Sequence, residues 1–148
     1  MKVKIQEAAG LRGVFRLKVF KKGKLFETYE DNNLIVSGAK EALAHLLAGQ
    51  GTGKNLTSIG FGTNGAVPLP EDTALKNAFV KDVTKITFPK QGYVEFSWDL
   101  LTSEANGKEI IEFGLLLSDG TLFSRKTRIK PISKDSDIAL EGQWEIIF

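Results

Sequence analysis

The chain has 148 residues, of which 42% are hydrophobic and 26% charged, a composition typical of a folded globular protein with one substantial core. Twenty basic residues against eighteen acidic ones leave a formal charge of +2, which is too balanced to indicate nucleic-acid binding. Cysteine is absent and His45 is the only histidine, which excludes disulfides, thiolate nucleophiles, Cys-ligated metals and a histidine-rich metal cage.

The first predicted elements are a pair of strands. Residues 13–20 show the period-two alternation of a half-buried strand, with three apolar side chains on one face: Phe15, Leu17 and Val19. A lysine-rich turn at 21–24 is predicted to be a solvent-exposed hairpin tip, and residues 24–30 return as the second strand.

A helix is predicted next, because the apolar residues change to a helical spacing: Ala39, Ala42, Leu43, Leu46 and Leu47. Ser37 is predicted to cap its N-terminus, and Gly49 to take a left-handed conformation just past its end. His45 lies off the apolar stripe near the C-terminus of this helix, so a surface imidazole is favoured over a catalytic one.

The next part of the chain combines a strand with a long loop. Residues 56–62 are predicted to form a short strand. Residues 64–78 are predicted to form a loop, since Pro68 and Pro70 block regular structure, with a helical turn at 72–77.

Five further segments are predicted to be strands: 80–88, 92–101, 108–117, 121–129 and 138–148. The first two form one predicted hairpin, and the Asp119-Gly120 pair turns the next two into another. Trp98 and Trp144 share strand faces with apolar neighbours, so they are predicted to be core residues and not a sugar-stacking platform.

These elements define the fold class. About eight strands, one helix and no βαβ alternation predict a mainly-β protein, an antiparallel β-sandwich with one amphipathic α-helix packed at an edge or end. No linker or internal repeat divides the chain, so residues 1–148 are predicted to form a single domain.

The glycine-rich run AGQGTGKN at 48–55 resembles part of a phosphate-binding loop. The motif needs a glycine where Ala48 stands and a hydroxyl side chain where Asn55 stands, and the run follows a helix although phosphates bind at the start of one. The run is therefore predicted to be a helix stop. Carboxylate pairs such as Glu95/Asp99 or Glu109/Glu112 select no catalytic site, and the protein is predicted to be non-enzymatic, without cofactor or metal.

Four segments resemble small tailed-bacteriophage virion proteins encoded among tail-fibre and baseplate genes: 13–49, IGFGTNGAVPLPEDTAL (59–75), EANGKEIIEFGLLLSDGTLFSRK (104–126) and IALEGQWEIIF (138–148). Gly62 and Gly65 of the second segment suit a loop that needs positive φ. The resemblance implies a structural protein of the tail, baseplate or fibre, found in the virion after assembly in the host cytoplasm. Its implied partners are copies of itself and other virion proteins.

Two alternatives remain open at this stage. A capsid-decoration or head-fibre protein would share the fold and differ in its docking partner. A carbohydrate-binding module contacting a host glycan would require aromatic rings and carboxylates exposed together.

Residues 1–10 are predicted to be an assembly arm. Lys2, Val3, Lys4 and Ile5 alternate charged with apolar side chains, as an edge strand does, and lie outside the resemblance. We expect this arm to contribute to assembly more than to the fold. The same region has no apolar stretch typical of a signal peptide, and no segment is apolar over a membrane-spanning length.

Overall fold

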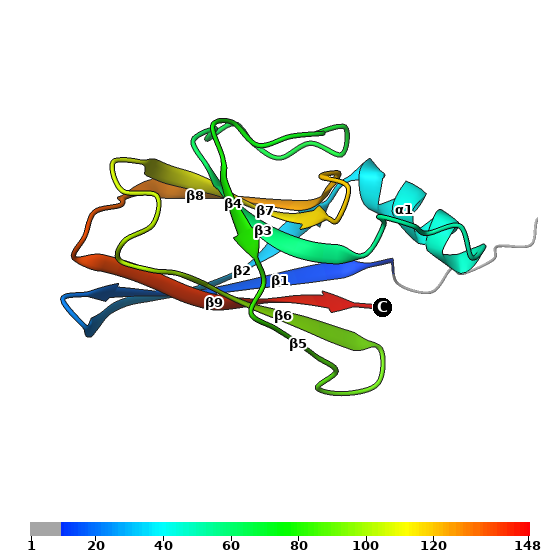
Figure 1. Ribbon diagram of the computed structural model, residues 1–148, viewed down its shortest axis with the longest axis horizontal. Coiled ribbons are helices and arrows are strands. Elements are labelled where there is room, and N and C mark those ends of the chain that lie inside the picture. Colours follow the sequence, from blue (N-terminus) through cyan, green and yellow to red (C-terminus); the bar gives the residue numbers. More distant parts are fainter. Residues whose placement is uncertain (1–9) are drawn as a thin grey trace, which may run out of the picture.

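The computed structural model describes residues 10–148 (Figure 1). Within these residues the chain forms one helix, α1 (Ser37–Leu47), and nine strands: β1 (Arg12–Lys21), β2 (Lys24–Ile35), β3 (Leu56–Gly62), β4 (Phe79–Asp82), β5 (Lys85–Thr87), β6 (Tyr93–Leu100), β7 (Glu109–Leu117), β8 (Leu122–Ser133) and β9 (Ile138–Ile147). The predicted assembly arm, with Lys2, Val3, Lys4 and Ile5, lies outside the described residues apart from Gly10.

The nine strands form one antiparallel sheet in the order β4-β3-β7-β8-β2-β1-β9-β6-β5. The strand pairing is shortest near the centre of the sheet, where β2 and β8 pair only through Leu34 with Arg125 and Ile35 with Ser124. The sheet curls at this junction, so β2-β1-β9-β6-β5 faces β4-β3-β7-β8 across a common core (Figure 1). The predicted mainly-β, sandwich-like fold with one helix at an end is confirmed.

Aromatic rings fill the middle of the core. The ring of Phe15 on β1 lies 5.1 Å from that of Trp144, 5.7 Å from that of Trp98 and 4.7 Å from that of Phe113 on the facing half-sheet. Trp98 and Trp144 are both buried, which confirms their prediction as core residues.

Helix α1 follows the predicted pattern with two exceptions. Ala39 and Ala42 are buried, and Gly49 has φ +74° while its amide donates to the Leu46 carbonyl, so the helix ends as predicted. The predicted Ser37 cap is wrong, since Val36 holds the N-cap position and no side chain caps it. Burial of Val36 and donation of the Ser37 amide to the Pro70 carbonyl set this end of the helix instead. Leu46 and Leu47, both predicted on the apolar stripe, are exposed, Leu47 almost fully.

The single strand predicted at 80–88 is in fact two strands on opposite edges of the sheet. β4 pairs with β3 and β5 pairs with β6, so the chain changes half-sheets in the two residues between them. There the Val83 amide donates to Thr57 and the Thr84 amide to Ser97, which holds the open side of the sandwich together.

The loop between β3 and β4 covers the outer face of β3 and β7 as a third layer (Figure 1). Leu75 packs where Gly60 and Gly114 lack side chains; a Cβ atom at Gly60 would lie 2.6 Å from Leu75 Cδ1. Leu75 also contacts a second small core formed by Val36, Leu116 and Leu122. The helical turn predicted at 72–77 is absent. The packing of the partly buried Leu75 and the contacts of Asp72 order this stretch without a helix.

Candidate interaction surface

The glycine-rich run after α1 docks on the β7–β8 hairpin. Lys54 Nζ lies 2.8 Å from Asp119 Oδ2, and the Asp119 amide donates to the Gly53 carbonyl at 3.0 Å. The Lys54 side chain is therefore engaged in a tertiary ion pair. The hydrogen bond that it donates, followed by those from Thr121, holds the pKa of Asp119 well below its ordinary value of 3.8.

This ion pair predicts a pH-dependent stability. A carboxylate whose pKa is lowered by folding stabilises the native state above the unfolded pKa, and this contribution is lost as pH falls through the folded pKa. We expect Asp119→Asn to lower the melting temperature at neutral pH and down to about pH 4, with the difference from the original chain vanishing at lower pH.

The matched control is Lys54→Met, which removes the charged donor and keeps the carboxylate. In that background Asp119→Asn should change the melting temperature less than it does alone. If the melting temperatures of Asp119→Asn and the original chain differed by the same amount in neutral and in strongly acid solution, the stabilising role of the Lys54–Asp119 ion pair would be contradicted.

A buried charged cluster lies under the β3–β4 loop and was missed in the sequence. Arg125 Nε donates to Glu112 Oε1 at 2.8 Å, and both side chains are buried. Arg125 Nη1 donates to Asp72 at 2.9 Å and Nη2 to the Asn64 carbonyl at 2.8 Å. The only sequence signal for this cluster is a glutamate inside the otherwise apolar run of β7.

The cluster ties the β3–β4 loop to β7 and β8. The second oxygen of Glu112, Oε2, accepts the backbone amides of Asn64 at 2.9 Å and Lys76 at 2.8 Å. A Cβ atom at Gly62 would lie 2.5 Å from this oxygen. Gly62 and Gly65 do not have the positive φ predicted for them, and Gly62 is instead required by the close approach of the carboxylate.

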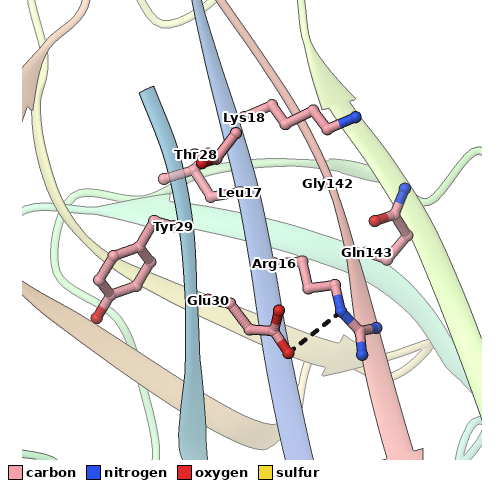
Figure 2. Close-up of a pocket in the computed structure, with 8 residues that line it drawn as sticks. All are labelled: Arg16, Leu17, Lys18, Thr28, Tyr29, Glu30, Gly142 and Gln143. Atoms are coloured by element: carbon pink, nitrogen blue, oxygen red, sulfur yellow. Dashed lines mark ion pairs between the residues drawn. The ribbon is translucent and has the colours of Figure 1, made fainter. Parts of the chain in front are cut away.

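A shallow polar pocket lies on the outer face of the half-sheet that contains β1, β2 and β9 (Figure 2). The pair of Arg16 and Glu30, at 3.5 Å, lines this pocket, and Figure 2 shows Tyr29 directed away from that pair. The Tyr29 ring packs edge-on against Phe15 in the core, at 6.3 Å. This pocket therefore presents carboxylate and guanidinium groups without an exposed ring for stacking on a sugar.

The surface best suited to binding is an apolar groove at one end of the sandwich, which we call the end groove. Its rim consists of four exposed side chains: Leu46, Ile86, Phe88 and Phe148. Its floor consists of more deeply placed apolar side chains: Leu43, Leu56, Val94, Phe96, Phe123 and Ile146. Figure 1 shows the elements that carry the rim, namely α1, the β5–β6 turn and the end of β9, at the same end of the molecule.

The end groove is apolar and open. Its volume is about 390 Å³. Among residues 10–148 its only polar lining residues are Asn55 and Lys54, and Lys54 is already paired with Asp119. Phe88 is 77% exposed and Phe148 62% exposed, although the sequence placed both on predicted strands. Contiguous exposed apolar side chains of this size mark interaction sites in soluble proteins.

A metal-binding cluster and a membrane-spanning helix are both absent from residues 10–148. No group of three or more His, Asp or Glu side chains there is arranged to hold a metal ion. In the same part of the chain, no helix has both the length and the apolar character needed to cross a membrane.

Comparison of the chain with protein-family models, with curated proteins and with solved structures finds no match.

Proposed function

We propose that this protein is a non-enzymatic structural protein that self-associates and docks through the end groove. The observation that carries the proposal is the exposure of Phe88 and Phe148 on the rim of an apolar groove. Burying two such rings against another chain removes a large apolar area from water, which is the main favourable term in protein association.

The rest of the described chain suits such a role. The buried pair of Glu112 and Arg125 fixes the longest loop, and the aromatic core joins the two half-sheets, so the groove is presented by a rigid support. The sequence resemblance supplies the setting that we propose: a tail, baseplate or fibre component of a tailed-phage virion, whose partners are its own copies and other virion proteins.

The proposal is tested by measuring mass in solution. Light scattering over a range of concentrations should show the original chain as an oligomer. The double variant Phe88→Ser with Phe148→Ser should weaken this association by at least about tenfold. A tenfold change corresponds to about 1.4 kcal/mol, and the variant loses the burial of two aromatic rings.

The matched control is Phe26→Ser, which removes a ring that is 60% exposed on the β1–β2 hairpin at the opposite end of the sandwich (Figure 1). This variant should associate like the original chain. A chain that stays monomeric up to about millimolar concentration, or a loss of association equal in both variants, would overturn the role of the end groove.

A further inference from the structure

We propose that residues 1–9 of a second copy of this chain occupy the end groove, bound as an extended strand along the free edge of β5. This inference rests on the proposed self-association and names the part of the partner that the groove receives.

The first observation is where the described chain begins. Arg12 pairs with Ile147 at the end of β9, and the next residue, Phe148, is on the groove rim. Leu11 packs against the core beside this point, and Gly10 is exposed. Residues 1–9 therefore join the fold at the end of the sandwich where the groove lies.

The second observation is an open sheet edge beside the groove. β5 is the outermost strand of its half-sheet and, among the described residues, pairs only with β6. Ile86 is opposite Phe96 in that pair, so Ile86 lies on the core-facing side while Lys85 and Thr87 lie on the outer side. A strand added along β5 would extend the floor of the groove with every second side chain.

The third observation is the pattern of the segment itself. Met1, Val3 and Ile5 alternate with Lys2 and Lys4. In an extended strand the three apolar side chains share one face and the two lysines share the other. Paired with β5, the apolar face would meet the groove and the lysines would face solvent, so backbone hydrogen bonds give affinity and apolar side chains give specificity.

Strand direction favours a second copy over the same chain. β1 and β6 run in one direction and β5 in the other, so β5 ends where β1 begins. A segment leading into β1 of its own chain could lie beside β5 only in the less stable parallel orientation. It would also have to cross four strand spacings, about 19 Å, which uses about six residues. A second copy has neither constraint.

The absence of cysteine from the chain allows a direct test by disulfide crosslinking between full-length copies. Copies with Lys4→Cys are mixed with differently sized copies carrying Thr87→Cys, because both positions fall on the solvent side of the proposed strand pair. The comparison pairs Lys4→Cys copies with Lys24→Cys copies, whose thiol lies at the opposite end of the sandwich. We expect the heterodimer with Thr87→Cys to form at least about tenfold faster than the heterodimer with Lys24→Cys, because binding in the groove raises the local thiol concentration.

Two double variants of the whole chain separate this inference from the proposed function. The test variant, Val3→Asp with Ile5→Asp, should abolish most association, whereas the control variant, Lys2→Ser with Lys4→Ser, should retain it. If the aspartate variant still associates while the Phe88 and Phe148 variant does not, the groove binds another part of the partner and the inference is wrong. A monomeric original chain whose melting temperature falls with the aspartates would place the segment in its own groove and would also overturn the inference.

Discussion

Replacing Trp98 with alanine is expected to destabilise the protein by about 3–5 kcal/mol, the range for removing a large aromatic side chain from a core. Trp98 is 2% exposed, and its ring lies 5.5 Å from Phe61 and 5.7 Å from Phe15, on opposite half-sheets. Both neighbours are held by strand pairing, so the core cannot close around the lost ring. Urea unfolding, with the slope checked for constancy, measures the change in free energy.

The control is Phe26→Ala, which removes an exposed ring that contacts Lys21 at 4.2 Å and should cost less than about 1 kcal/mol. The same experiment tests the carbohydrate-binding alternative. A Trp98→Ala chain of full stability that had lost binding to a glycan would contradict the core assignment and favour that alternative.

Breaking the buried pair of Glu112 and Arg125 is expected to destabilise the protein by up to about 3–5 kcal/mol for either single replacement. Arg125→Met leaves the Glu112 carboxylate buried without a counter-charge, and Glu112→Gln leaves Arg125 with the partly buried Asp72 as its one remaining carboxylate partner among the described residues. Glu112→Gln keeps one oxygen for the amides of Asn64 and Lys76, and Arg125→Met keeps the volume of the side chain. The double variant should cost less than the sum of the two, by about 0.5–3 kcal/mol, because neither charge is then left alone.

Hydrogen exchange distinguishes this local role from a general loss of stability. The amides of Asn64 and Lys76 donate to Glu112, so they should exchange faster in Glu112→Gln under conditions where the amides of β1 remain protected. Additive single effects below about 1 kcal/mol, or equal protection of the loop in all variants, would show that the cluster does not hold the loop in place.

Much of the fold was predictable because its signals are local. The alternation of Phe15, Leu17 and Val19 marks β1, since a strand has two faces and only one of them meets the core. Asp119-Gly120 marks the hairpin between β7 and β8, with Gly120 at φ +89°. Gly49 ends α1 for the same conformational reason. Each of these features depends on residues within a few positions of one another.

The candidate site was much less predictable. Phe88 and Phe148 have the alternation of strand residues, yet each lies just past the end of its strand, β5 or β9, and is exposed on the groove rim. Where a sheet ends depends on the lengths and order of strands far apart in the sequence. Lys2, Val3, Lys4 and Ile5, the assembly contact that the sequence predicts, lie outside the described residues.

The sequence by itself determined which segments are strands with one apolar face and which segments are turns, and therefore the class of the fold. Only the tertiary structure decided which strands pair outside the predicted hairpins. Residues 80–88 have one continuous strand pattern, but β4 and β5 lie on opposite edges, because Val83 and Thr84 bond to different half-sheets. Arg125 and Glu112 meet because the irregular register of the β7–β8 hairpin places Arg125 opposite Gly114, two residues from Glu112. Local periodicity specifies the faces of a strand and carries no record of its neighbours, which are selected by burial and pairing over the whole chain.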